Sequence, residues 1–280
     1  MTTPQTHYKA PQSIDPVGFF LGAMAGLAGA LLIAPIYALA IAYIPIVYLN
    51  ALLTGCAGFA IGWGVCTALR AGHFHNAPIS YGMALGALGL AYWTHWIMWF
   101  AVLAFRSDAN VLDALYMLYP PALLSAIGAV YDVGTWSISG GDVNGIPLGI
   151  TWVLEALIFF GAGLVGALGT VGTGTYCARC KAWCTKIVER RLAFDDGTTL
   201  SHALNQRQDW SALLRPAPAE HDAMWYAVFI DQCPSCRETG TLTVNSVRVS
   251  HDSKDNREEK STLEVDRVYI AGADVTRLTA

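Results

Sequence analysis

Long uncharged apolar runs dominate the chain up to about residue 172. From Val17 to Leu69 there are 53 consecutive residues without a single Asp, Glu, Lys or Arg. A helix that crosses the hydrocarbon core of a bilayer needs about 20 apolar residues. This run is therefore long enough for two helices, with a turn marked by Pro45 and Asn50. The whole pattern predicts four spanning helices, near residues 17–43, 50–69, 79–105 and 148–171.

Polar segments flank and separate these runs. Residues 1–16 are polar and contain three prolines, and we predict that they form a disordered lead-in. The apolar run that follows is far longer than the core of a secretory signal, which is about 7–15 residues long, so cleavage is not expected. Residues 106–147 form the longest connection between spans, and they include two short amphipathic pieces at 111–118 and 122–133.

Beyond residue 172 the pattern changes to short strand-like segments. Residues 241–249 and 262–271 alternate between apolar and polar positions, which is typical of half-buried strands. Residues 223–231 form an apolar, aromatic run expected of a buried strand, and residues 200–214 have helical spacing. The charged segment 251–260 is expected to be a hairpin loop.

The predicted fold class follows from these patterns. We expect an all-α membrane domain, a four-helix bundle over residues 17–172, followed by a small α+β domain of zinc-ribbon type over residues 173–280.

Charge follows the same division of the chain. Of 17 Lys and Arg, 14 lie after Val171, and of 21 Asp and Glu, 15 do. Overall only 14% of residues are charged, against about 25% in typical soluble domains. The tail has nearly balanced charges and no basic stripe, so a nucleic-acid partner is not expected.

The positions of the cations also predict an orientation. With four spans, the N-terminus, the second connection and the tail share one side, which carries Lys9, Arg70 and five cations between residues 179 and 191. The opposite side carries Arg106 and four aspartates. Because cytoplasmic segments are enriched in Lys and Arg, both termini should be cytoplasmic and the 106–147 loop should lie outside.

Two C-x-x-C motifs, Cys177 with Cys180 and Cys233 with Cys236, carry the clearest chemical signal. Zinc binds four thiolates in a tetrahedron, and two such turns can supply two thiolates each. Because four cysteines leave no ligand position open for water, the zinc is predicted to be structural. Iron in a rubredoxin-like site is the rival metal, and Cys184 is a spare thiol that could replace Cys180.

His95 and Glu155 are the strongly polar, ionisable residues deep within predicted spans. Ionisable groups are costly inside a bilayer, so each suggests a function. The two residues lie at similar depths, to within about one helical turn, and we expect them to face each other. A structural hydrogen bond, a Glu155 placed near the membrane interface, and a proton or ion site are the three interpretations.

Small residues recur four positions apart in the predicted spans. In lipid, this spacing lets helix backbones approach closely. We expect it to serve packing within the bundle, or the formation of a homo-oligomer. The glycines concerned are Gly22, Gly26, Gly58, Gly62, Gly82, Gly86 and Gly166.

The layout resembles uncharacterised bacterial membrane proteins in which several spans precede a cytosolic domain with two C-x-x-C motifs. The resemblance rests on the last span, residues 152–168, which leads into Cys177 and Cys180 and then to Cys233 and Cys236. It implies the topology and the metal site only. We also expect the chain to lie in a bacterial inner membrane.

Two functions fit these features, and a third fits less well. A non-enzymatic membrane adaptor would use its zinc domain to dock a cytosolic protein or a second copy of the chain. A small transporter or channel component would use His95 and Glu155 along a polar path. An enzyme is the weaker alternative, because we find no nucleophile-plus-base set and no phosphate-binding motif.

Overall fold

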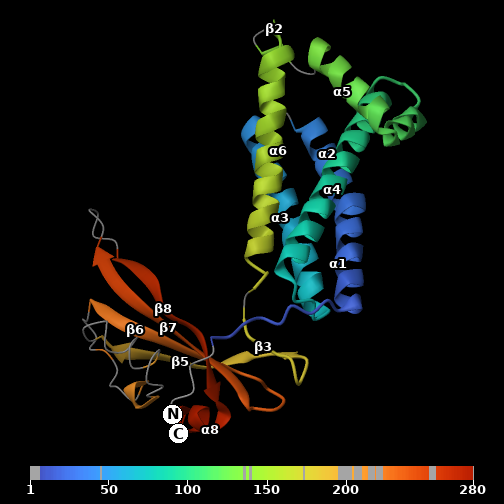
Figure 1. Ribbon diagram of the computed structural model, residues 1–280. Coiled ribbons are helices and arrows are strands. Elements are labelled where there is room, and N and C mark those ends of the chain that lie inside the picture. Colours follow the sequence, from blue (N-terminus) through green and yellow to red (C-terminus); the bar gives the residue numbers. More distant parts are fainter. Residues whose placement is uncertain are drawn as a thin grey trace. The chain divides into compact units, whose positions relative to one another are not determined.

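The computed structural model divides the chain into two compact units (Figure 1). One is the helical unit, Gln12–Thr173, and the other is the sheet unit, which joins Met1–Pro11 to Gly174–Ala280. The structure describes residues 7–44, 46–134, 137–138, 141–172, 174–194, 204, 210–213, 218, 223–251 and 257–279.

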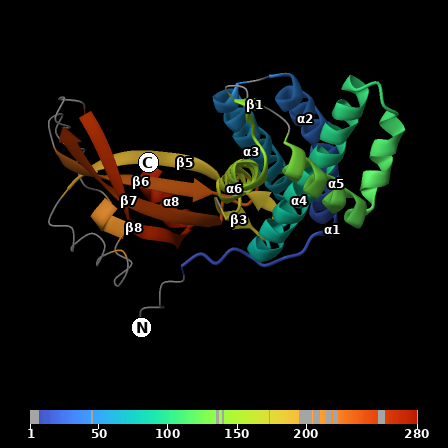
Figure 2. The same cartoon turned by 90° about the horizontal axis from the view of Figure 1, so that it is seen from above.

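The helical unit contains four helices that are long and apolar enough to cross a membrane (Figures 1 and 2). The first is continuous and consists of three parts: α1 (Pro16–Ala28), a short π-helical segment η1 (Gly29–Ile33) and α2 (Ala34–Tyr43). The others are α3 (Val47–Ala71), α4 (Ala77–Arg106) and α6 (Gly145–Leu168). The four predicted spans are therefore present, with ends shifted by at most three residues.

Polar residues at the ends of the apolar runs set where two of these helices begin. The Asp15 side chain accepts a hydrogen bond from the Val17 N–H at 2.9 Å, and Pro16 occupies the first helical position. Asn76 caps α4 in the same way by accepting from the Ile79 N–H at 3.1 Å. Such caps satisfy N–H groups that a helix start leaves without partners.

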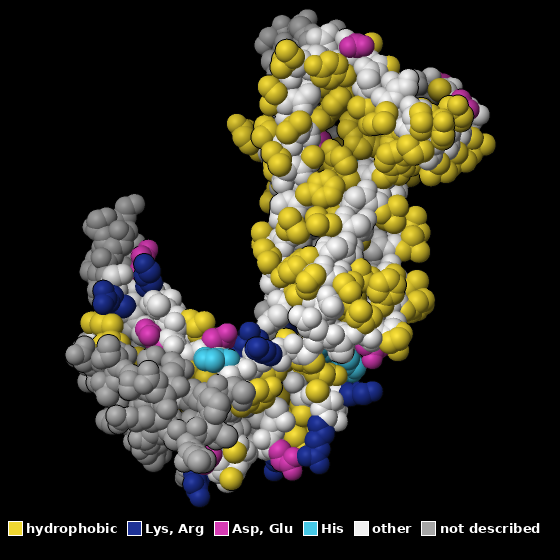
Figure 3. All heavy atoms as spheres, in the orientation of Figure 1, with side chains coloured by type: hydrophobic (Ala, Val, Ile, Leu, Met, Phe, Trp, Pro, Cys, Tyr) yellow, Lys and Arg dark blue, Asp and Glu magenta, His cyan; other side chains and the backbone are white. Residues whose placement is uncertain are grey.

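Side chains on the outer surface of the helical unit are largely apolar. Figure 3 shows them covering its visible face, whereas Lys, Arg, Asp and Glu gather over the sheet unit. Phe20, Leu32 and Ile36 are more than 60% exposed. A soluble protein rarely exposes such a large apolar surface, and lipid is the solvent that suits it.

Two helical pieces occupy the connection between α4 and α6. They are η2 (Val111–Leu118), a 3₁₀ helix, and α5 (Pro120–Val133), and they meet at a bend of 118°. Two short strands, β1 (Ser137–Ile138) and β2 (Gly141–Asp142), follow. The helical unit has four candidate spans, or five if the bent pair counts as one.

Glycines allow α3 and α6 to pack with their backbones in close contact. A Cβ atom added to Gly58 would lie 2.1 Å from the Phe159 carbonyl oxygen, and one on Gly62 would lie 1.9 Å from that of Gly163. A Cβ atom added to Gly166 would lie 2.6 Å from the carbonyl oxygen of Phe59.

The packing predicted for glycines elsewhere is present on the first helix but not on α4. Added Cβ atoms on Gly22 and Gly26 would meet Leu69 and Ala87 at 2.6 and 2.9 Å. In contrast, Gly82 and Gly86 have no neighbour within 4 Å of such an atom, so the prediction of close packing within the chain is wrong for these two. The rotation of α4 about its axis explains this result. Its other face, which carries Ala84, Leu88 and Ala91, is turned inward and fully buried.

The sheet unit is built on an antiparallel sheet with the strand order β5-β6-β7-β8. The strands are β5 (Thr185–Ala193), β6 (Met224–Gln232), β7 (Thr239–His251) and β8 (Arg257–Ala271). A short hairpin of β3 (Tyr176–Cys177) and β4 (Ala182–Trp183) precedes them, and the helix α8 (Gly272–Thr279) follows. The three predicted strands correspond to β6, β7 and β8, whereas β5 and α8 were not predicted.

One face of this sheet forms the core of the unit. Alternate residues of β6, namely Tyr226, Val228 and Ile230, are buried against the neighbouring strands, as period-2 alternation requires. Val275 and Leu278 of α8 belong to the same core. The predicted helix at 200–214 lies mostly outside the described residues, although Trp210–Leu213 forms a 3₁₀ turn, η4. Of the predicted loop at 251–260, residues 252–256 lie outside the description, and 257–260 belong to β8.

The segment before α1 pairs with the sheet at the first residues that the structure describes. The Tyr8 N–H donates to the Arg267 carbonyl oxygen at 2.7 Å, and His7 pairs with Val268 as an antiparallel bridge. Residues 7 and 8 thus extend the sheet at the edge of β8. The prediction of a disordered lead-in is wrong for residues 7 and 8, because unpaired strand edges attract such pairing; residues 1–6 lie outside the description.

Candidate metal centre and buried polar cluster

Two tight turns bring the four predicted cysteines together. Cys177 ends β3 and Cys180 lies in the turn to β4, while Cys233 and Cys236 lie in the turn between β6 and β7. Their sulfur atoms all lie within 4.8 Å of one another, and those of Cys177 and Cys236 are 3.9 Å apart. A tetrahedral zinc with Zn–S bonds of about 2.3 Å holds its sulfurs about 3.8 Å apart. The four cysteines therefore have the spacing of a four-thiolate site.

The two turns share a backbone feature. In each one, the residue directly after the second cysteine has a left-handed conformation: φ is 50° at Lys181 and 56° at Arg237. Residues with a side chain rarely adopt this conformation. In the second turn, the Arg237 N–H donates to the Cys233 carbonyl oxygen at 3.0 Å, which closes the loop. This repeated geometry is a second indication, independent of the sulfur distances, that both turns are built for one purpose.

The turn also favours the thiolate form that a metal requires. Hydrogen bonds from the backbone N–H groups of Thr239 and Glu238 lower the pKa of Cys236 to about 6. The pKa of Cys180 is shifted in the opposite direction, because the hydrogen bond with Cys236 raises it to about 12. Without a metal, the Cys180 sulfur holds a proton that it shares with the Cys236 sulfur. A cation at the centre would replace that proton.

Cys184 does not belong to the group. It lies between β4 and β5, and its N–H donates to the Thr175 carbonyl oxygen at 2.8 Å. Its sulfur is not among the four that lie within 4.8 Å of one another, and burial raises the pKa of its thiol to about 12. The structure therefore selects Cys180 over Cys184 as the partner of Cys177.

The N-terminal segment contacts the metal turn, which sequence reasoning missed. The Tyr8 hydroxyl oxygen accepts a hydrogen bond from the Tyr176 N–H at 3.0 Å, one residue before Cys177. The Tyr8 ring also packs edge-on against Tyr269 at 5.8 Å and lies under the Arg267 guanidinium at 5.4 Å. This single tyrosine links the edge of β8 to the first metal turn.

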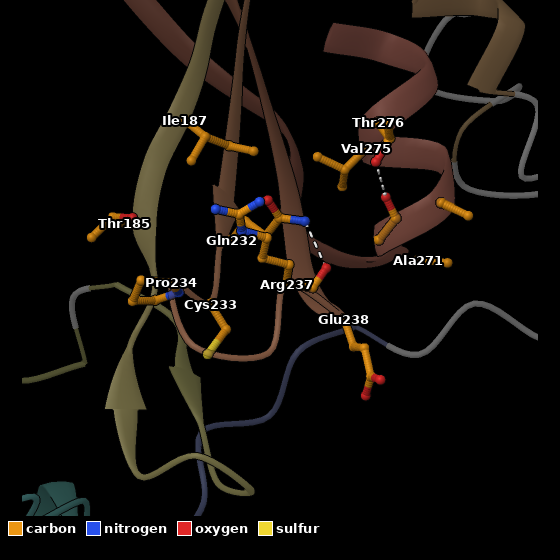
Figure 4. Close-up of a pocket in the computed structure, with 12 residues that line it drawn as sticks. Thr185, Ile187, Gln232, Cys233, Pro234, Arg237, Glu238, Ala271, Val275 and Thr276 are labelled. Carbon is orange, nitrogen blue, oxygen red and sulfur yellow. Dashed lines mark hydrogen bonds between the residues drawn. The ribbon is translucent and has the colours of Figure 1, made fainter. Parts of the chain in front are cut away.

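A cavity of about 850 Å³ lies beside the second metal turn. Figure 4 shows Cys233 and Pro234 of this turn on one side, Thr185 and Ile187 of β5 next to them, and Val275 of α8 opposite. The Gln232 side chain bonds the Arg237 carbonyl oxygen at 2.7 Å across the strand end. The cavity is therefore framed by the second metal turn, β5 and α8.

Comparison with known proteins adds no relative: no family model, curated protein or solved structure matches this chain. The function is therefore inferred from the geometry.

The second predicted pair, His95 and Glu155, also comes together. The His95 Nε2 atom lies 3.5 Å from the Glu155 Oε1 atom, and the His95 side chain is only 3% exposed. The Tyr37 hydroxyl lies 2.5 Å from the same carboxylate oxygen and 2.7 Å from the Thr54 hydroxyl. The four side chains come from α2, α3, α4 and α6, so every long helix contributes one member to this buried polar cluster.

Aromatic rings enclose the cluster. The Tyr37 and Tyr92 rings lie 4.6 and 5.9 Å from the His95 imidazole, and the Phe159 ring lies 6.3 Å from that of Tyr37. Among the described residues, His95 Nδ1 is buried with no hydrogen-bond partner. Tyr37 and Thr54 were missed from the sequence because neutral hydroxyls in an apolar helix carry no charge to draw attention to them.

Proposed function

We propose that this chain is a multi-pass membrane protein that serves as a non-enzymatic adaptor or assembly component, with one structural zinc ion in a zinc-ribbon-like domain. The observation that carries the proposal is the group of four sulfurs within 4.8 Å, presented by two turns of matching backbone geometry. Four protein thiolates fill a tetrahedral zinc site and leave no position for substrate or catalytic water. The metal then acts by holding the two turns and the sheet together.

The sheet unit supports a topology of four crossings. Residues 7–11 precede the first span, and residues 174–280 follow the last, yet both belong to the sheet unit. Two segments of one compact unit must lie on the same side of a membrane, so the number of crossings between them is even. The bent η2–α5 pair therefore stays on one side.

The cations near the spans favour the cytoplasm for the sheet unit, in a bacterial inner membrane. An impermeant thiol reagent should label Asn144→Cys on intact cells, above the level of the unsubstituted chain. It should label Glu258→Cys only after permeabilisation. The reverse pattern would place the sheet unit outside.

The cavity beside the second metal turn is the docking surface that we propose. It is open, and it combines apolar Ile187 and Val275 with the charged Arg237 and Glu238. A cytosolic protein segment, or a second copy of the chain, would bind here. Because Cys233 and Pro234 line the cavity, its shape depends on the metal turn.

Metal analysis of the full-length protein in detergent tests the proposal. We expect about one zinc per chain, and no metal in Cys236→Ser, while Cys184→Ser keeps a full complement. A coloured protein with one iron per chain would change the identity of the metal in this proposal, but not the four cysteines that bind it. A metal-free protein with a folded sheet unit would refute the structural role.

A small transporter or channel component is the second candidate. The observation in its favour is the polar cluster, because Glu155 contacts His95 and Tyr37, and Tyr37 contacts Thr54, so that all four long helices take part. Polar groups placed at such an intersection can respond to a ligand that moves the helices relative to one another.

A further inference from the structure

A continuous series of short contacts leads from Glu155 to the start of α3. Glu155 Oε1 lies 2.5 Å from Tyr37 Oη, which lies 2.7 Å from Thr54 Oγ1. Thr54 Oγ1 lies 2.8 Å from the Asn50 carbonyl oxygen. The Asn50 side chain then donates to the Ile44 carbonyl oxygen at 3.1 Å, in the connection between α2 and α3. Each of the three oxygen–oxygen distances is a hydrogen-bond distance.

The number of hydrogens decides how this series is bonded. Each of the three oxygen–oxygen contacts needs one hydrogen, and carbonyl and carboxylate oxygens can only accept. With Glu155 ionised, the hydroxyls of Tyr37 and Thr54 supply two hydrogens. One contact then brings two oxygens together with no hydrogen between them. A proton on Glu155 supplies the third, and every contact becomes a hydrogen bond.

The direction of donation differs between these two states. In the protonated state, Glu155 donates to Tyr37, Tyr37 donates to Thr54, and Thr54 donates to the Asn50 carbonyl oxygen. In the ionised state, Thr54 donates to Tyr37 and Tyr37 donates to the carboxylate. The Thr54 hydroxyl must turn away from Asn50 for this to happen.

We propose that Glu155 is a reversible proton-binding site, and that Tyr37 and Thr54 relay its charge state to the connection between α2 and α3. The ligand is a proton, and the readout is the hydrogen bond that Thr54 gives to, or withdraws from, the Asn50 carbonyl. The proposal is independent of the adaptor role, and it gives the second candidate function its ligand.

Opposing influences on Glu155 make the binding reversible. The hydrogen count and the apolar surroundings favour the protonated state. The imidazole of His95 opposes them, because its Nε2–H tautomer points a hydrogen at the carboxylate from 3.5 Å and leaves Nδ1 as a bare acceptor. The other titratable groups facing the site are Tyr37 from α2 and Tyr92 from α4; α3 contributes neutral groups.

Infrared difference spectroscopy of the full-length protein in lipid nanodiscs tests the proposal. Titration from mildly acidic to mildly alkaline pH should remove the C=O stretch of a protonated carboxylic acid. That band should be absent at every pH in Glu155→Gln, whose amide can still donate to Tyr37 and preserve the fold. It should remain in Asp132→Asn, which removes an exposed carboxylate of α5.

Two further variants test the relay itself. Tyr37→Phe removes the link between Glu155 and Thr54, so adding Thr54→Val to Tyr37→Phe should not shift the pH at which the band vanishes. Thr54→Val removes two bonds from the protonated state but one from the ionised state, so the band should vanish at lower pH. The shift caused by Thr54→Val alone should be roughly one pH unit, the size expected for one hydrogen bond.

Three results would overturn the proposal: no band sensitive to Glu155→Gln, a band that no pH removes, or an equal shift by Thr54→Val with and without Tyr37→Phe. None of these variants touches the cysteines, so all should keep their metal. A failure here is thus distinguishable from a failure of the adaptor proposal.

Discussion

The metal turns and the buried polar cluster solve the same problem in opposite ways. Each gathers four polar side chains from distant parts of the chain into a space a few ångströms across. The cysteines sit in short turns at the ends of strands, and their sulfurs lie close enough together to hold a metal ion. The polar cluster sits on four long helices, and its contacts from Glu155 through Tyr37 and Thr54 to Asn50 lack one hydrogen when Glu155 is ionised. We therefore expect the first site to need its ligand in order to fold, and the second to bind and release its ligand while folded.

The largest expected effect comes from a substitution that disrupts the metal turns and leaves the buried polar cluster intact. Cys177→Ser should abolish metal binding and expose the sheet unit to protease, because folding of a four-thiolate domain is coupled to a metal affinity of about 10–16 kcal/mol. The helical unit should keep its helicity and its response to pH. Limited proteolysis with circular dichroism measures both, and Cys184→Ser is the matched control. Loss of both units together would show that the two sites are not separable.

The next effect tests whether backbone packing positions the polar cluster. Gly58 lies one turn from Thr54, and it contacts the Phe159 carbonyl, which lies one turn from Glu155. Gly58→Ala should force α3 and α6 apart and destabilise the helical unit by about 1–3 kcal/mol. Gly86→Ala should be close to neutral, because an added Cβ atom there has no neighbour within 4 Å. Thermal unfolding in detergent distinguishes them, and equal losses would contradict the packing described.

The smallest effect sharpens the role of the N-terminal segment. Tyr8→Phe removes the acceptor of the Tyr176 N–H but keeps the ring contacts. Loss of about 1 kcal/mol should speed removal of the metal by a chelator about fivefold. The control is Tyr48→Phe, which alters a tyrosine that is 89% exposed on α3. An unchanged rate would mean that Tyr8 does not support the metal turn.

The sequence predicted the features that depend on local pattern. Uncharged runs located the four spans, and alternation located β6, β7 and β8. The strand β5 was not predicted because its only buried residues, Val188 and Leu192, are four positions apart. The charged residues between them are exposed. An edge strand with charges on both faces has no period-2 signal.

Features that depend on contacts distant in the chain could not be predicted in the same way. Tyr8 pairs with residues more than 250 positions away, so nothing in its own neighbourhood marks it as a strand. The pairing of His95 with Glu155 was predictable because ionisable groups are rare in spans. Tyr37, which joins them, looks like any other tyrosine. The inward face of α4 depends on helix rotation, and the glycine spacing at Gly82 and Gly86 does not determine it.

X-ray absorption at the zinc edge of the full-length protein tests the central claim most directly. The four-thiolate site predicts a first shell of four sulfurs at about 2.3 Å, with no oxygen or nitrogen ligand. It also predicts that Cys180→Ser changes the shell and Cys184→Ser does not. A shell containing nitrogen or oxygen in the unmodified protein, or one that changes with Cys184 and not with Cys180, would contradict the account.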